Sequence, residues 1–304
     1  MLIETGGEDH RWIKESMDQM GALADAAPPA PAAAEGDPID PFVRQHLGAS
    51  CGHLYSGVAQ RLTRYPIPNF PMPPGHGRLL LDLGCMWGRW TVAAARRGYH
   101  VVGIDPGLNA ILAAKRVARQ LGVEATFVVG DARYMPFRDR SFDAVFSYSV
   151  LQHFSMDSSR RTLAQVARCL KPGGTCLIQL AQVFGLRSLM VQAQRGFKKP
   201  SGFDVRHWSV PRMRRTFREI IGPTRLRVDG FFNLNPQPTD LLLLPLKSRM
   251  VVRISEALRK LSRLLPFLIY VADSIYVEAT TSCLETETAS TTRLSSSRSA
   301  GSTS

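Results

Sequence analysis

Short apolar runs alternate with longer amphipathic stretches between residues 79 and 181 of the 304-residue chain. Apolar runs of this length, bounded by glycine or polar residues, are typical of strands that are buried on both faces of a sheet. The pattern predicts five strands, at 79–83, 100–106, 125–131, 142–149 and 175–181.

The stretches between these runs carry apolar residues near helical spacing and predict helices at 90–97, 107–121 and 160–170. The segment LKPGG, at 170–174, is predicted to be the turn before the fifth strand. Strands that alternate with helices in this way form a parallel sheet covered by helices on both faces.

The alternation ends after residue 182, where a basic segment with aromatic residues leads to a predicted strand at 225–234. The segment 240–267 has the pattern of a basic amphipathic helix, with apolar positions on one side at Val251, Ile254, Leu258, Leu261 and Leu265. A last strand is predicted at 270–280, paired antiparallel with 225–234. The prediction is therefore an α/β, three-layer sandwich with a mostly parallel seven-stranded sheet and an antiparallel last strand.

Both ends of the chain differ in composition from the rest. Residues 1–40 are rich in Ala and Pro and carry nine acidic and two basic residues, and residues 283–304 are rich in Ser and Thr. We expect both to be disordered tails around one domain at 41–282. The N-terminus lacks the pattern of a secretory signal, and five cysteines without a CxxC pair argue against disulfides and zinc. The expected location is the cytoplasm.

The net charge of +13 is unevenly distributed. Residues 41–186 contain 17 basic and 7 acidic residues, and residues 187–263 contain 17 basic and 5 acidic residues. Such a balance favours an anionic partner, which could be a phosphorylated substrate, nucleic acid or an acidic membrane, although a solvated Arg-rich surface would give the same numbers.

Small and polar residues stand where the predicted strands end, which is where parallel sheets bind ligands. Gly84 and Gly88 let the backbone approach a ligand, but a dinucleotide turn would also need glycine at 86 and 89, where this chain has Met86 and Arg89. Asp105 is placed to accept the hydroxyls of a ribose, and Asp131 could accept a hydrogen bond from adenine. These positions together predict a mononucleoside ligand.

Several segments in this order resemble the class I S-adenosylmethionine-dependent methyltransferases, specifically the type 11 kind. The matched segments lie within 76–181 and read DLGCMWG, GIDP, GDARYMPF, SFDAVFSYSVLQHF and LKPGG. The resemblance implies a Rossmann-like fold and S-adenosyl-L-methionine as cofactor, bound through Asp82, Gly84, Cys85, Gly88, Asp105, Pro106, Asp131, Ala132 and Tyr148. One departure is Met86, which replaces the middle glycine of the usual E/D-x-G-x-G-x-G pattern.

The acceptor is expected near the end of the fourth predicted strand, at Ser149, Gln152 and His153, with His207 as a further candidate. His153 is the candidate general base, because a hydroxyl acceptor must lose a proton, and the alternative is a packing role at a helix start. Methyl transfer needs no metal, and no cluster of metal-ligating residues is visible in the sequence.

The segment SYSV replaces the [DN]-P-P-[FY] pattern of base-modifying amino methyltransferases. We therefore expect O-methylation of a small-molecule, lipid-linked or glycan-precursor acceptor, with an RNA methyltransferase, a catalytically silent binding protein and a nucleotide-dependent oxidoreductase as alternatives. Residues 182–269 would form the acceptor and lid region. Within it, the basic helix at 248–265 either lies on the inner face of an anionic membrane, binds a phosphate-bearing acceptor, or covers the sheet as ordinary core.

Overall fold

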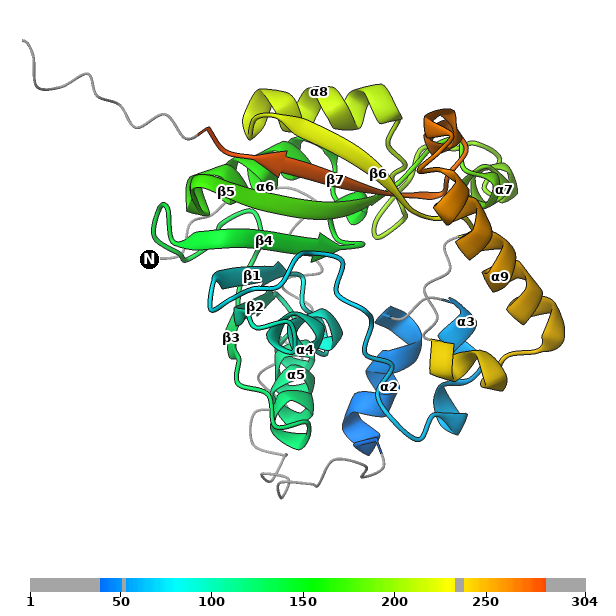
Figure 1. Cartoon of the computed structure of the whole chain (residues 1–304), viewed down its shortest axis with the longest axis horizontal. Helices are drawn as coiled ribbons and strands as arrows, with labels where there is room; N and C mark the ends of the chain where they lie inside the picture. The colour runs from blue at the N-terminus through cyan, green and yellow to red at the C-terminus, as the bar shows by residue number, and fades with distance from the viewer. Residues whose placement is uncertain (1–38, 51–52, 233–237, 283–304) are drawn as a thin grey trace, which may run out of the picture.

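The computed structural model describes residues 39–50, 53–232 and 238–282. Its sheet contains seven strands: β1 (Leu79–Leu83), β2 (His100–Asp105), β3 (Thr126–Val129), β4 (Phe142–Tyr148), β5 (Leu170–Ala181), β6 (Thr224–Gly230) and β7 (Ser274–Thr280). The spatial order is β3-β2-β1-β4-β5-β7-β6 (Figure 1). The predicted tails, 1–40 and 283–304, lie outside the described residues, apart from residues 39 and 40.

The strand directions confirm the predicted fold class. β1 is parallel to its two neighbours, β2 and β4. β2 is parallel to β3, and β4 is parallel to β5. β7 is antiparallel to both β5 and β6, so the last strand of the chain is the antiparallel one. The carboxyl ends of all six other strands therefore lie at one edge of the sheet, together with the start of β7.

The predicted turn at 170–174 is part of β5 in the structure. Leu170 pairs with Phe142 of β4, but the next pair along the two strands joins Thr175 to Ala144. Several residues of β5 thus face a single residue of β4, and Gly173 has a positive φ of 73°. The prediction of a separate turn was wrong because an irregular β-bulge carries the chain through this segment without ending the strand.

The helices are α2 (Pro41–Ser50), α3 (His53–Ser56), α4 (Arg89–Ala95), α5 (Leu108–Gln120), α6 (Met156–Cys169), α7 (Leu186–Gln194), α8 (Val210–Ile220) and α9 (Leu246–Leu261). Shorter 3₁₀ turns are η2 (Ala59–Arg61), η3 (Leu151–His153), η4 (Pro238–Leu243) and η5 (Pro266–Tyr270). α6 begins before the predicted residue 160, because the Ser155 hydroxyl accepts the backbone N–H of Ser158 and caps the helix. The predicted helix at 240–267 is divided into η4, α9 and η5. Pro245 precedes α9 and Pro266 begins η5. The segment is divided at these points because a proline does not continue a preceding helix.

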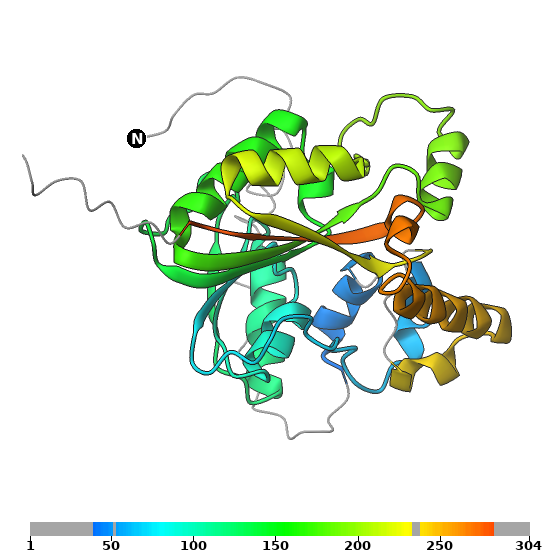
Figure 2. The same ribbon diagram turned by 45° about the horizontal axis from the view of Figure 1, so that its top comes forward.

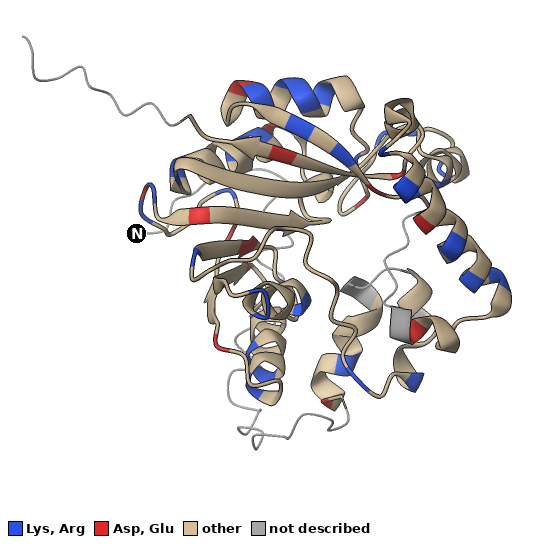
Figure 3. Cartoon of the chain, in the orientation of Figure 1, with Lys and Arg blue, Asp and Glu red and all other residues tan. Residues whose placement is uncertain are grey.

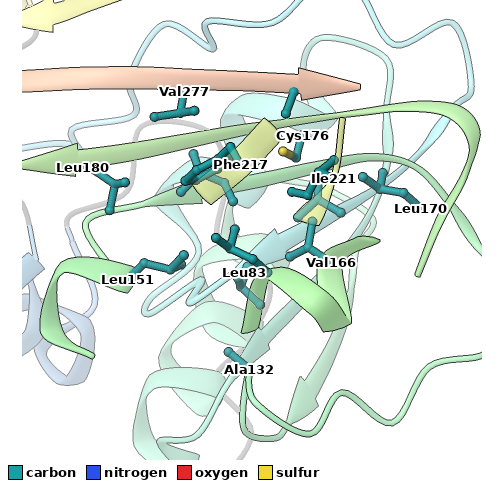
Figure 4. Close-up of a cluster of buried hydrophobic side chains, with 14 of the residues drawn as sticks. Leu83, Ala132, Leu151, Val166, Leu170, Cys176, Leu180, Phe217, Ile221 and Val277 are labelled. Carbon is teal, nitrogen blue, oxygen red and sulfur yellow. The ribbon is translucent and has the colours of Figure 1, made fainter. Parts of the chain in front are cut away.

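Helices cover both faces of the sheet, as the turned view shows (Figure 2). α6 and α8 pack on one face through a cluster that includes Val166, Phe217 and Ile221 (Figure 4). On the other face, Trp90 and Ala94 of α4 pack against Leu80 and Phe146. These two hydrophobic layers hold the strand ends in fixed positions.

The N-terminal helices form a third packed group beside the carboxyl edge of the sheet. Val43 and Leu47 of α2 share a buried cluster with Trp87 of the glycine turn and with Val252 of α9. The Tyr55 hydroxyl donates to the Asp240 carboxylate at 2.7 Å, which joins α3 to η4. Segments from both ends of the described chain therefore lie next to the glycine turn.

Candidate active site

The polar edge of the sheet begins with the turn after β1. Gly84 and Gly88 have φ angles of 74° and 83°, in the left-handed region that favours glycine. A Cβ on Gly84 would clash with Val150, and one on Gly88 would lie 3.2 Å from Ala114 Cβ of α5. The two glycines thus bring the backbone of the turn close to Val150, in the segment after β4, and to α5.

Asp105 joins the tip of β2 to this turn. Its Oδ2 accepts the backbone N–H of Met86 at 3.0 Å, and its Oδ1 accepts the N–H of Gly107 at 2.9 Å. Burial raises the pKa of the Asp105 carboxyl, and the hydrogen bonds from Gly107 and Met86 partly oppose this rise. Since each carboxylate oxygen can accept a further hydrogen bond, the group fits the two hydroxyls of a ribose. Pro106, the next predicted contact, is half-buried beside it.

Asp82 lies deeper in the sheet and supports the turn from below. Its Oδ2 accepts the Thr91 hydroxyl at 2.6 Å, so it fixes the start of α4. Burial is the largest influence on this carboxyl and raises its pKa to about 7. Thr91 is a residue that the sequence analysis missed, although its position in the first turn of the predicted helix could have indicated it.

The side chains of Cys85 and Met86 point into packed regions. Cys85 is 2% exposed, and a Cβ on Gly103 of β2 would lie 2.9 Å from its Sγ. Burial raises the pKa of the Cys85 thiol well above its usual value. Met86 has a φ of 49° and packs against the cluster of α2, α3 and Trp87. Either residue would therefore present its backbone to a ligand.

Asp131 follows β3 and is held by an arginine. The Asp131 carboxylate accepts the backbone N–H of Arg133 at 2.8 Å and its guanidinium at 2.7 Å. Ala132 between them is 8% exposed and belongs to the cluster under α6 and α8. This arrangement fixes the segment GDAR next to the tip of β2, where the sequence predicts the adenine.

Tyr148, at the end of β4, is part of a buried polar network that reaches β6 and β7. Its hydroxyl donates to Asp229 Oδ2 at 2.9 Å, and the Ser274 hydroxyl donates to the same oxygen at 2.6 Å. Gln179 Nε2 donates to Ser274 at 2.6 Å, while Gln179 Oε1 accepts the Ser149 N–H and hydroxyl, each at 2.8 Å. Burial raises the pKa of Asp229. The predicted residues Tyr148 and Ser149 are thus brought together with three that sequence reasoning missed.

His153 lies in η3 and contacts the segment that follows α7. Its Nδ1 is 2.8 Å from the Phe203 carbonyl oxygen, and the two rings stack at 4.0 Å between centroids. A carbonyl only accepts hydrogen bonds, so Nδ1 carries the proton and Nε2 is the basic atom of the neutral ring. Burial lowers the pKa of His153, so the neutral form predominates at neutral pH.

The other two predicted acceptor-side residues lie in the same region. Gln152 is 8% exposed, and its Oε1 has no hydrogen-bond partner among the described residues. His207 lies on the segment that Arg206 ties to His153, through an Arg206 Nη1 bond to the His153 carbonyl oxygen at 2.8 Å. Burial lowers the pKa of His207. Within the described residues, no group of His, Cys, Asp or Glu could hold a metal ion.

Comparison with known proteins places a family match on this region. Residues 80–174 match a family described as a methyltransferase domain. A probable tRNA methyltransferase 9B of Homo sapiens is 37% identical over 103 residues, which are 34% of this chain and 21% of that protein. An uncharacterized methyltransferase of Synechocystis is 35% identical over 121 residues, or 40% of this chain and 54% of that protein. The matches thus span from about a fifth to about half of these relatives' own length.

A solved structure shares the fold over a longer part of the chain. It is a phosphoethanolamine N-methyltransferase 2 of Haemonchus contortus in complex with S-adenosyl-L-methionine, with a TM-score of 0.50 and 17% identity. The similarity covers 79% of this chain and 60% of that one. At this level of identity the likeness shows a shared Rossmann-like fold.

Proposed function

We propose that this chain, which carries a class I S-adenosylmethionine-dependent methyltransferase domain over residues 80–174, transfers the methyl group of its cofactor to a hydroxyl. The acceptor would be a small-molecule, lipid-linked or glycan-precursor compound. The observation that carries the proposal is the position of His153, with a basic Nε2, on the segment that follows the strand end carrying Tyr148 and Ser149.

The residues at the carboxyl edge fit the cofactor. The turn at Gly84, with its left-handed backbone, would face the amino-acid end of S-adenosylmethionine, and Asp105 would offer a carboxylate to the ribose. The segment around Asp131 and Ala132 would contact the adenine. The bound cofactor supplies a methyl group that is already activated by its sulfonium, so the protein has only to align an acceptor with it and remove a proton.

His153 would take the proton of the acceptor hydroxyl on Nε2 while the oxygen attacks the methyl group. The Nδ1–H donated to Phe203 fixes the ring orientation and the tautomer, in the way that a second partner orients a catalytic imidazole. The imidazolium that forms then releases its proton to water. Gln152 Oε1, on the preceding residue, is buried and has no hydrogen-bond partner among the described residues, so it would accept a hydrogen bond from an acceptor that reached it.

Ser149 and Gln179 support a hydroxyl acceptor over a base amine. In this chain, the Ser149 backbone N–H and hydroxyl both donate to the Gln179 amide oxygen, so the strand end is held by a side-chain amide. The sequence SYSV at this position has no proline, and Val150 stands where the [DN]-P-P-[FY] pattern of base-modifying enzymes has its aromatic residue. An RNA acceptor remains the second candidate, because one relative is named as a probable tRNA methyltransferase.

The test is incubation of the full chain with S-adenosylmethionine labelled in the methyl group and a fractionated cell extract. We expect label in lipid, polysaccharide or small-molecule fractions, and loss of that label with Asp105→Ala. Label that appears only in RNA would replace the proposal by the RNA methyltransferase. Binding of the cofactor without label in any fraction would indicate a silent binding protein.

A further inference from the structure

Apolar side chains are exposed together at one end of the molecule, on α7, α9 and η5. We call this set the apolar end; it is represented by Leu186, Met190, Met250, Ile254, Leu264 and Phe267, with exposed fractions from 49% to 78%. Soluble monomers seldom expose apolar side chains in one continuous area, and such areas usually mark an interaction site.

α9 is oriented with its apolar side toward solvent. The side that packs on the protein carries Val252 and Ser255, and the Ser255 hydroxyl bonds the backbone N–H and C=O of Phe231 at 3.2 and 2.8 Å. The opposite side carries Leu246, Met250 and Ile254, which are 71%, 54% and 49% exposed. One role expected from the sequence was that this helix covers the sheet as ordinary core. The structure differs, because the apolar side of the helix is exposed.

The three elements of the apolar end are joined to one another. Gln182, before α7, donates from Nε2 to the Tyr270 carbonyl oxygen of η5 at 2.6 Å. The Asp273 carboxylate, which follows η5, accepts the backbone N–H of Ser188 in α7 at 2.8 Å. η5 follows α9 directly in the chain, and both views show α7, η5 and α9 in succession at the same end (Figures 1 and 2).

Basic residues surround these apolar side chains. The segment 183–199 contains four basic residues and no acidic one, and 246–271 contains six basic residues and one acidic one. That acidic residue, Glu256, is paired with Arg259 at 2.6 Å. Lys and Arg recur along α9 (Figure 3), and Lys247, Arg253 and Lys260 are exposed. The net charge of the two segments is +9.

We propose that the apolar end docks the protein onto an anionic lipid bilayer. An amphipathic helix in the plane of the interface buries its apolar side among the lipid chains while its basic residues attract the anionic headgroups. None of the helices in the described part of the chain has the length and apolarity needed to cross a bilayer. A nucleic acid would complement the charge but would leave the exposed leucines and methionines in water.

Docking would also position the candidate active site. Phe203, which is 76% exposed and stacks on His153, lies on the same loop that leaves α7. A bilayer at the apolar end would thus lie on the side of the site that receives the acceptor. This consequence rests on the proposed function, whereas the docking itself does not.

Co-sedimentation with vesicles tests the docking and requires no methyl transfer. The full chain is spun at low salt with vesicles of phosphatidylcholine alone or mixed equally with phosphatidylglycerol. The variants Met250→Glu/Ile254→Glu and Arg253→Glu/Lys260→Glu change the apolar and basic residues of α9. Arg212→Glu/Arg215→Glu is the matched control, because it reverses two exposed charges on α8, which packs on a face of the sheet.

We expect the wild type to pellet with the anionic vesicles only, and each α9 variant to lose affinity by at least about tenfold, since each basic residue near the surface contributes on the order of a kcal/mol. The α8 control should stay within about threefold of the wild type, because its two arginines are not part of the apolar end and would not lie at the bilayer surface. Circular dichroism and S-adenosylmethionine binding, which the α9 changes should leave intact, establish that the variants are folded.

Three results would overturn the docking. The first is a wild type that stays in the supernatant, and the second is an α8 control that loses as much affinity as the α9 variants. The third is an α9 variant that pellets normally but fails to bind a homopolymeric RNA or to form a dimer seen in the wild type. That outcome would assign the apolar end to RNA or to a second copy of the chain.

Discussion

At the residue scale, Asp105 links the tip of β2 to the glycine turn of the predicted cofactor region. It holds the backbone of Met86 and Gly107 and is expected to hold the ribose as well. We predict that Asp105→Ala weakens S-adenosylmethionine binding by on the order of a hundredfold, because about two buried hydrogen bonds to a charged group are lost. Calorimetric titration measures this, with Asp139→Ala as a control because Asp139 is 70% exposed. Unchanged affinity would remove Asp105 from the site.

Asp82 gives a prediction about pH. Its pKa is about 7 in the folded protein and 3.8 for an ordinary aspartate, so between these values the folded chain binds more protons than the unfolded chain. The free energy of unfolding should therefore fall as the pH rises from 3.8 to about 7. Asp82→Asn keeps an acceptor for Thr91 and should lack this fall. Urea unfolding of both proteins across this range tests the prediction, and a wild type that gains stability relative to the variant would contradict it.

His153 gives a prediction about the reaction. Its pKa is lowered from 6.5, so the basic form is present throughout the neutral range. Methyl transfer should be independent of pH down to 6.5, and its decrease should set in at a more acidic pH than for an ordinary histidine. His153→Gln should reduce kcat by about 10² to 10⁴-fold with little change in cofactor affinity. Activity within threefold of the wild type would leave His153 with a packing role against Phe203.

Met86 shows what a sequence can and cannot predict about one residue. The missing glycine was visible in the motif, but the direction of the side chain was not. Met86 packs against a cluster that joins its neighbour Trp87 to Val43 and Leu47, which α2 brings from a distant part of the chain. Sequence periodicity carries no information about such long-range contacts, so the residue could be identified but not placed.

At the scale of elements, the strands of the core could be predicted because each is a short apolar run between polar breaks. α8 was missed although Met213 and Phe217 have helical spacing, because the arginines around them resemble a solvated segment. The polar network of Tyr148, Asp229 and Gln179 could not be predicted. It depends on β7 lying between β5 and β6, which sequence order does not determine.

α7 depends on a single close contact. A Cβ on Gly185, just before the helix, would clash with Asp273, whose carboxylate holds Ser188 at the start of α7. We predict that Gly185→Ala destabilises the protein by about 1–3 kcal/mol, as overpacking does, and speeds hydrogen exchange in α7 and η5. Gly57→Ala is the control, because the nearest atom to its Cβ would be 4.0 Å away. Equal protection of α7 in both variants would contradict this account.

At the scale of the whole molecule, the uneven charge was visible in the sequence and its position was not. The basic residues of 187–263 lie mainly on α8, on β6, on α9 and on the loop that follows α7. A helical pattern shows that a helix has an apolar side but not whether that side meets the protein or the solvent. Only the fold shows that α9 turns this side outward.

The central claim is that the carboxyl edge of the sheet holds one nucleoside joined to an amino acid, and the direct measurement is calorimetric titration of the full chain with S-adenosylmethionine and, separately, with NAD. The glycine turn with Met86 and Arg89 in place of two glycines predicts micromolar binding of S-adenosylmethionine and no binding of NAD. Binding of NAD, or of neither compound, would contradict the account.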